Sequence, residues 1–297
     1  MDPRHGVPPL QSKCVRNDAS ATDRWSLAKR PRSGRWELPD KDLSYIMIAS
    51  CGQTLNNPGR CTALRQGWTT APKDGRTDGL KQLILDRGAV AVGIADLCGF
   101  FEEPSRKQVF AVAFGMRYPD SEIDLLPSDE ALQTAMRGIT EQTKDIYSEI
   151  DALIQGTDPG AICRRIDTVE PTLGRMHPQL SQKAVAVLAG LGWIGKSSLL
   201  VHPVHGPRMR IGTMFTDTLL AADEPYKGNH CGRCEICVDA CPAQAASGEE
   251  VRFGSLLGYC IDRETCRTHL YRHESRIHRA EFCGLCLKEC PIGKATT

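Results

Sequence analysis

The sequence predicts an α+β fold in which an α/β domain precedes a small cysteine-rich domain. Between residues 76 and 222, apolar runs typical of buried strands are interleaved with helical patterns. Nine of the 14 cysteines then lie between Cys231 and Cys290. Residues 1–75 show neither pattern. We therefore expect three parts, with boundaries at 1–75, 76–222 and 223–297.

The composition is that of a globular protein without a global electrostatic target. Hydrophobic residues make up 41% of the 297 positions and charged residues 25%. A formal net charge of +1 gives no overall attraction to nucleic acid or anionic lipid, so such a partner would need a local basic patch. No apolar stretch reaches the roughly 18 residues of a membrane span. The N-terminal residues also lack the apolar core that a secretory signal needs. We expect a cytoplasmic protein without a membrane partner.

Residues 1–75 contain several prolines and a basic run from Lys29 to Arg35, with little hydrophobic periodicity. This pattern predicts a disordered tail, or an over-extended start with initiation nearer Met47. A nucleic-acid-binding arm is the alternative. Because a short basic run is more often solvated chain, we favour the tail.

Order begins near Asp78. Leu80, Leu83 and Ile84 have helical spacing, and Gly88 supplies a stop signal. Two short apolar runs follow, at 89–95 and 108–115, and both are typical of buried strands.

The second half of this domain repeats the alternation. Residues 126–154 predict one long helix or two, ending in the turn-forming segment 156–160. A third strand is expected at 161–167, and an alternating fourth at 208–217. Strands interleaved with helices make this an α/β or α+β domain.

The most specific motif is Cys231-x2-Cys234-x2-Cys237-x3-Cys241-Pro242. This spacing is that of bacterial ferredoxins, in which three close thiolates bind one [4Fe–4S] cluster and the fourth binds the other. A zinc site needs only four ligands and does not require this spacing of cysteines followed by proline. The motif therefore predicts a ferredoxin-like domain with two [4Fe–4S] clusters.

A second, incomplete run follows as Cys283-x2-Cys286-x3-Cys290-Pro291. It lacks its first cysteine, which either Cys260 or Cys266 could supply. Crossing the ligands assigns the first cluster to Cys231, Cys234, Cys237 and Cys290. The second cluster is assigned to Cys241, Cys283, Cys286 and either Cys266 or Cys260. Two clusters form a path for single electrons, which implies a redox centre at its far end.

The loop Gly190–Ser197 matches two phosphate-binding patterns, G-x-x-x-x-G-K-[ST] and G-x-G-x-x-G. Both patterns require a preceding strand and a substantial following helix. Here Pro203 and Pro207 leave less than two turns of helix after Lys196, and the segment 182–189 is equally compatible with a helix. We therefore do not expect an NTP or dinucleotide site, although glycines can still expose N–H groups to another ligand.

Three segments together resemble one enzyme family. The segment Ala189–Lys196, the strand ending at Gly212–Asp217 and the double cysteine motif look like epoxyqueuosine reductase and its close homologues, over roughly residues 78–294. Members of that family are monomeric iron–sulfur and cobalamin enzymes that reduce epoxyqueuosine in tRNA to queuosine. They are also related to the reductive dehalogenases.

The resemblance implies a corrinoid-binding-type α/β domain and an oxidoreductase mechanism. Electrons would pass through both clusters to cobalamin held between the two domains. Cys266 would be the upstream ligand, since the segment Asp262–Arg267 is similar to that of the family. The corrinoid-side loop residues would be Gly190, Gly192, Trp193, Gly195 and Lys196.

The resemblance also implies a proton donor. The family's acid lies in a V-D-T-A-P segment shortly before the glycine loop, and the segment Ile166–Pro171 offers Asp167. The stretch from Asp167 to the loop is longer here, so the substrate could differ, and a surface aspartate is the alternative. Glu170 and His177 are substitutes to test.

Partners follow from the same resemblance. We expect a low-potential electron donor of flavodoxin or ferredoxin type, tRNA as the substrate carrier, and a monomer. The basic segment from Arg267 to Arg279 could contact tRNA phosphates, or could be a solvated helix face. Two other functions stay open: an electron-transfer protein that serves a corrinoid partner without substrate chemistry, and an ATP-dependent activator that uses residues 190–197.

Overall fold

The computed structural model describes residues 75–97, 109–127, 129–165, 181–251, 260–272 and 283–294. All of them belong to one compact unit, Asp42–Thr297. The expected tail up to residue 74 lies outside the described residues, as does the segment 166–180.

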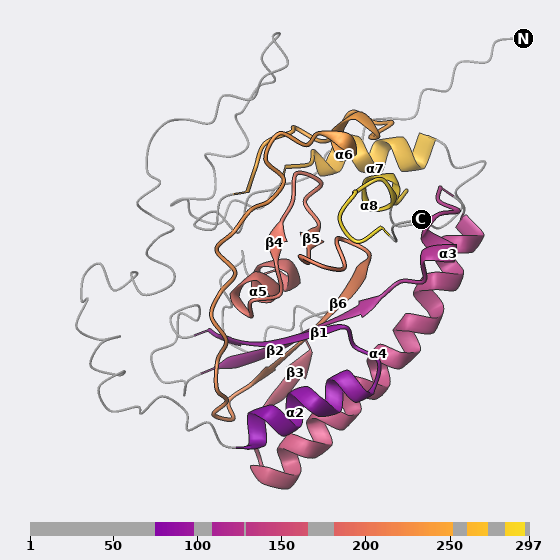
Figure 1. Cartoon of the computed structure of the whole chain (residues 1–297). Coiled ribbons are helices and arrows are strands. Elements are labelled where there is room, and N and C mark those ends of the chain that lie inside the picture. The colour runs from indigo at the N-terminus through magenta and orange to yellow at the C-terminus, as the bar shows by residue number, and fades with distance from the viewer. Residues whose placement is uncertain are drawn as a thin grey trace, which may run out of the picture. The chain divides into compact units, whose positions relative to one another are not determined.

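A four-stranded antiparallel sheet forms the centre of this unit (Figure 1). Its order is β1 (Ala91–Asp96), β2 (Phe110–Arg117), β6 (Met209–Thr216) and β3 (Cys163–Arg165). The register places Val112 between Ile94 of β1 and Met214 of β6. Every pair of this sheet is antiparallel, so the described strands favour the α+β alternative over α/β.

The larger helices pack on one face of the sheet. These are α2 (Gly75–Asp86) and α4 (Asp129–Thr157), and the short α3 (Asp120–Ile123) precedes α4. Alternate residues of β2 point toward them because side chains along a strand have a period of two. These residues are Phe110, Val112, Phe114 and Met116.

The opposite face is lined by small residues because α5 (Gln182–Leu188) lies very close to the strands. Ala111 and Ala113 of β2 join the α5 side chains in a second apolar cluster. A Cβ atom at Gly93 would lie 2.0 Å from the carbonyl oxygen of Ala189, at the end of α5. Substituting Gly93 would therefore push the helix off the sheet.

The expected elements of this domain are found with small changes. Helix α2 ends before Gly88, whose φ of +91° suits a glycine at a helix stop. The segment expected as one helix or two is the single helix α4, of 29 residues. Strand β6 is buried on both faces along most of its length, because it lies between two strands and between α4 and α5.

The C-terminal elements are short. A hairpin of β4 (Trp193–Ile194) and β5 (Leu200–Val201) precedes the cysteine-rich part. The helices α6 (Ile236–Asp239), α7 (Arg263–Arg272) and α8 (Leu285–Lys288) each carry one cysteine of the motifs, and they group together in Figure 1. Within the described ranges, no helix has the length and apolarity needed to cross a membrane.

Arg208 joins the sheet domain to the C-terminal segment. Its side chain is 1% exposed, and it donates to Asp120 at 2.7 Å and to Asp124 at 3.0 Å. It also donates to the carbonyl oxygen of Lys288 at 3.0 Å. Nearby, Gly206 packs so closely on Ile292 that a Cβ atom would lie 1.8 Å from its carbonyl oxygen. The last described segment is therefore held against the sheet domain by polar contacts and close backbone packing.

Candidate iron–sulfur site

Electrostatic interactions link Cys237 and Cys286 each to the three other thiols that the sequence assigns to the same cluster. In the first group, burial and then the charges of three neighbouring thiolates raise the pKa of Cys237 to about 11. Those neighbours are Cys231, Cys290 and Cys234. Cys290 interacts in turn with Cys231 and Cys234. We call this set, Cys231, Cys234, Cys237 and Cys290, the first thiol group.

The second group forms around Cys286. Burial, followed by neighbouring thiolates, raises the pKa of Cys286 to about 12. Cys266 also has a raised pKa, first through burial and then through the charges of Cys283 and Cys241. We call this set, Cys241, Cys266, Cys283 and Cys286, the second thiol group. Cys237 also acts on Cys286, so the two groups are neighbours.

The donors of each group are four thiols, the ligand type of iron–sulfur clusters. Among the described residues, no three His, Cys, Asp or Glu side chains lie close enough together to hold a single metal ion. In a [4Fe–4S] cluster each thiolate binds a different iron, so the sulfurs stand farther apart. None of the ten described cysteines forms a disulfide. The donor set therefore fits two [4Fe–4S] clusters.

Cys260 and Cys266, the two alternatives for the eighth ligand, have different surroundings. Cys266 lies in α7 and interacts with the second thiol group. Cys260 is 5% exposed, and its backbone N–H donates to Ser198 Oγ at 2.7 Å. Burial and then the charge of Glu249 raise the pKa of Cys260 to about 11, and Cys231 and Cys237 of the first group add to this. Of the two, Cys266 is the one whose interacting neighbours are thiols of the second group, Cys283 and Cys241.

Two hydrogen bonds to sulfur were missed by reasoning from the sequence. The indole N–H of Trp193 donates to Cys231 Sγ at 3.4 Å. The backbone N–H of Ala245 donates to Cys241 Sγ at 3.3 Å. Each thiol group therefore receives at least one N–H donor on its sulfurs.

The glycine-rich loop is built into the chain's own packing. It follows helix α5 and leads into the β4–β5 hairpin, whereas a phosphate-binding loop follows a strand and opens a helix. Gly190 has a φ of +81°, and a Cβ atom there would lie 2.8 Å from the carbonyl oxygen of Glu224. A Cβ atom at Gly192 would lie 2.1 Å from that of Val201. These contacts argue against the ATP-dependent activator.

The remaining loop residues are also enclosed. Trp193 is 3% exposed and Lys196 is 5% exposed, and Lys196 Nζ lies 3.7 Å from Glu235 Oε1. Gly195 packs against the first thiol group, since a Cβ atom there would lie 3.4 Å from Cys231 Sγ. The loop therefore connects the sheet domain to the first thiol group. Its described residues do not present an open surface for a corrinoid.

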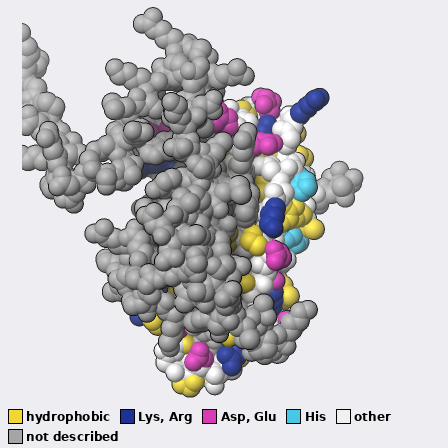
Figure 2. Space-filling model, turned by 90° about the vertical axis from the view of Figure 1, so that its left-hand side faces the viewer, with side chains coloured by type: hydrophobic (Ala, Val, Ile, Leu, Met, Phe, Trp, Pro, Cys, Tyr) yellow, Lys and Arg dark blue, Asp and Glu magenta, His cyan; other side chains and the backbone are white. Residues whose placement is uncertain are grey.

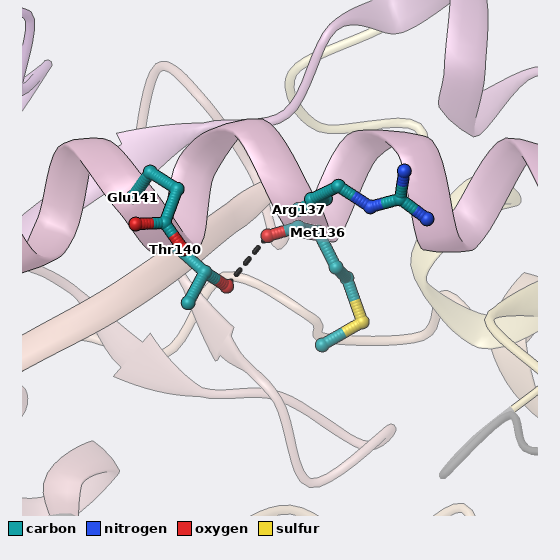
Figure 3. Close-up of a pocket in the computed structure, with 4 residues that line it drawn as sticks. All are labelled: Met136, Arg137, Thr140 and Glu141. Atoms are coloured by element: carbon teal, nitrogen blue, oxygen red, sulfur yellow. Dashed lines mark hydrogen bonds between the residues drawn. The ribbon is translucent and has the colours of Figure 1, made fainter.

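The expected proton donor cannot be placed. Asp167, Glu170 and His177 all lie in the segment 166–180, outside the described residues. A shallow surface pocket elsewhere is lined by four residues of α4: Met136, Arg137, Thr140 and Glu141 (Figure 3). Thr140 Oγ1 donates to the carbonyl oxygen of Met136 at 2.6 Å there. None of these residues belongs to the thiol groups.

Comparison with known proteins finds relatives that match parts of the chain. No family model matches the chain. An epoxyqueuosine reductase of Synechococcus sp. (strain CC9605) is 53% identical over 138 residues, which are 45% of this chain and 39% of that protein. Nearly half of the chain is thus similar in sequence to an epoxyqueuosine reductase. The resemblance expected from the sequence is thereby confirmed.

Two further proteins match shorter parts of the chain. An epoxyqueuosine reductase of Pseudomonas aeruginosa is 37% identical over 89 residues, 30% of this chain and 22% of that protein. A tetrachloroethene reductive dehalogenase of Desulfitobacterium hafniense is 48% identical over 69 residues, 22% of this chain and 12% of that protein. The matches thus cover less than two-fifths of each relative's length.

Solved structures of two reductive dehalogenases are similar to the fold of this chain. A catabolic reductive dehalogenase in complex with 3-bromo-4-hydroxybenzoic acid aligns with a TM-score of 0.56 and 20% identity, over 77% of this chain and 33% of that chain. A reductive dehalogenase whose structure suggests a mechanism for B12-dependent dehalogenation aligns with a TM-score of 0.55, also at 20% identity. At this identity the likeness shows a shared mixed helix-and-sheet fold.

Proposed function

We propose that the chain is an iron–sulfur oxidoreductase of the epoxyqueuosine reductase type, in which two [4Fe–4S] clusters pass electrons to a corrinoid. One observation supports this above the others: Cys237 and Cys286 each interact with the three other thiols that the crossed ligand pattern of two-cluster ferredoxins assigns to the same cluster. The curated relatives named epoxyqueuosine reductase support the reaction class.

The chain's own residues would do three things for the clusters. The first and second thiol groups supply four thiolates each. Burial and mutual repulsion keep several of these thiols protonated in the metal-free chain, so iron binding has to release protons. The adjacency of Cys237 and Cys286 brings the two groups together, as a path for single electrons requires. When bound, the clusters supply one-electron transfer at low potential.

Cobalamin is proposed from relatives rather than from a cavity. The B12 dependence named for the dehalogenase structure, whose fold this chain shares, supports it. Because the described loop residues Gly190, Gly192, Trp193, Gly195 and Lys196 pack within the chain, we derive no step from them toward a corrinoid. Asp167 stays the proposed proton donor, on its place in the sequence before the loop.

The substrate and partners are proposed from the same relatives. We propose epoxyqueuosine in tRNA as the substrate, a flavodoxin- or ferredoxin-type donor, a monomeric state and a cytoplasmic location. Figure 2 shows basic, acidic, histidine and hydrophobic side chains interspersed over the described part of one face, without a concentration of positive charge there. Contacts to tRNA phosphates would then come from other surfaces, such as the basic segment that begins in α7.

Anaerobic reconstitution tests this proposal. The purified chain should bind about eight irons and eight acid-labile sulfides, as two cubane clusters require. Cobalt should be retained after incubation with cobalamin. Supplied with a low-potential chemical reductant as the source of two electrons, and with protons from the buffer, the loaded protein should convert the epoxyqueuosine of a tRNA stem loop to queuosine and water. Zinc in place of iron would overturn the cluster assignment. Clusters without cobalt or turnover would instead favour an electron-transfer protein that serves a corrinoid partner.

A further inference from the structure

The indole of Trp193 is aimed at a predicted cluster ligand. Trp193 lies on β4, at the centre of the glycine-rich loop, and is 3% exposed. Its Nε1–H donates to Cys231 Sγ at 3.4 Å, although the two residues are 38 positions apart in the chain. An N–H to sulfur distance of this size is ordinary for a hydrogen bond to a large, soft acceptor.

Neighbouring rings fix the orientation of this donor. Trp193 stacks on Tyr226, with ring centroids 5.7 Å apart and planes at 28°. His230 meets the indole edge-on at 4.9 Å, and its Nε2 lies 2.9 Å from the Tyr226 hydroxyl. The loop also approaches the same sulfur at Gly195, where a Cβ atom would lie 3.4 Å from Cys231 Sγ. The indole is therefore held against the thiol by packing on several sides.

A hydrogen bond to a thiolate sulfur changes the redox balance of the cluster that the thiolate binds. Hydrogen bonds to the sulfurs are among the factors that set the reduction potential of an iron–sulfur cluster. The cluster gains one negative charge when it accepts one electron from the external donor. An N–H donor stabilises the more negative, reduced form, and so it raises the reduction potential.

We propose that Trp193 is a positioning residue that raises the reduction potential of the cluster held by the first thiol group, through its N–H donated to Cys231. This inference rests on the proposed function, because it requires the cluster. The second thiol group has a backbone donor, Ala245 N–H to Cys241 Sγ, which Trp193→Phe leaves in place. The two clusters should therefore respond differently to a change at position 193.

The test is an EPR-monitored redox titration of the reconstituted full chain. Trp193→Phe keeps an aromatic ring in the stack and removes only the N–H. One of the two cluster potentials should fall in this variant, while the other stays at its wild-type value. Tyr226→Phe is the matched control, since it removes a hydroxyl from the same stack without touching sulfur, and it should leave both potentials unchanged.

Two results would overturn the inference. Eight bound irons with both potentials unchanged in Trp193→Phe would remove the role of Trp193 and leave the proposed function standing. An equal shift in Trp193→Phe and Tyr226→Phe would show a general packing effect instead. A chain that binds no iron or sulfide would overturn both the proposed function and this inference, so the iron and sulfide counts separate the failures.

A second measurement needs no folding-sensitive variant. Wild-type protein carrying tryptophan labelled with ¹⁵N at the indole should show a ¹⁵N hyperfine coupling to one reduced cluster in pulsed EPR. The coupling requires the indole nitrogen to share spin density through the hydrogen bond to Cys231. Its absence in a fully reconstituted sample would contradict the contact.

Discussion

The guanidinium of Arg208 and the carboxylate of Asp120 form a 2.7 Å ion pair that links the sheet domain to the cysteine-rich segment. Arg208 is almost completely buried, and it also donates to the carbonyl oxygen of Lys288, two residues after Cys286. Arg117 makes a second pair with Asp120 at 2.8 Å and donates to the carbonyl oxygen of Gly293. The placement of the second cysteine run therefore depends on two arginines of the sheet domain.

Arg208→Met should destabilise the fold by about 2–4 kcal/mol, because it leaves acceptors unpaired beside a buried apolar side chain. Urea unfolding of the metal-free chain measures this. Lys144→Ala is the control, since its pair with Glu141 is exposed and should change stability by about 0.5 kcal/mol or less. An equal effect of both substitutions would show that the Arg208 network does not hold the fold.

Stability should depend on pH through Asp120. Partial burial alone would raise the pKa of this carboxyl, but hydrogen bonds and charge from Arg117 and Arg208 outweigh it and lower the pKa. The folded state then binds fewer protons than the unfolded chain, so stability rises with pH. The stability difference between wild type and Asp120→Asn should be full above about pH 5 and shrink as the pH falls through about 4 and below. A difference that stays constant from pH 7 to pH 3 would contradict the ion pair.

Cys234→Ser should lower the iron content of the reconstituted chain and weaken its broad absorbance near about 400 nm, since one corner of the first cluster loses its thiolate. Cys163→Ser is the matched control. Cys163 is a half-buried thiol on β3, paired with Thr216, and belongs to neither thiol group. The control should keep full iron content; unchanged iron in Cys234→Ser would refute the ligand assignment.

Gly192→Ala should destabilise the fold by more than about 2 kcal/mol, because the residue has a φ of +155° and no room for a Cβ atom beside Val201. Gly79→Ala provides the contrast. Gly79 lies in α2 with nothing within 4 Å of the new methyl group, so alanine should stabilise the helix by about 0.5–1 kcal/mol. Thermal unfolding should show a lower stability for Gly192→Ala and a higher stability for Gly79→Ala than for the wild type. A Gly192→Ala protein as stable as the wild type would mean that the loop is not packed as described.

Asp167→Asn should leave iron and cobalt bound but abolish turnover of epoxyqueuosine-containing tRNA, if this residue donates the proton. Glu170→Gln, three positions later, is the comparison and should retain activity. Metal analysis with single-turnover assays separates the effects on binding and on chemistry. Full activity in Asp167→Asn would remove this residue from the mechanism and direct attention to Glu170 and His177.

Local patterns predicted the elements well, because they depend on nearby residues. The spacing of Leu80 and Ile84 and the stop at Gly88 are properties of one short segment, and α2 forms where they indicate. The cysteine spacings likewise reflect ligand geometry, so they predict ligand sets without reference to the rest of the fold. Apolar strands were found for the same reason, but their antiparallel order depends on pairings that no single segment contains.

Long-range contacts could not be inferred. The glycines of the 190–197 loop match phosphate-binding patterns in sequence, yet their neighbours are the backbones of Glu224 and Val201. A pattern records that a position needs glycine without naming what approaches it. The choice between Cys260 and Cys266 and the contact from Trp193 to Cys231 similarly depend on how distant segments pack.

The crossed membership of the two thiol groups has a consequence for biosynthesis. Cys290 belongs with Cys231, Cys234 and Cys237, while Cys241 belongs with residues that come later in the chain. As the polypeptide leaves the ribosome, neither set is complete until nearly the whole cysteine-rich region has been translated. A product that stopped before Cys283 would hold three thiols of the first group and two of the second, so neither predicted cluster could have its full ligand set on an unfinished chain.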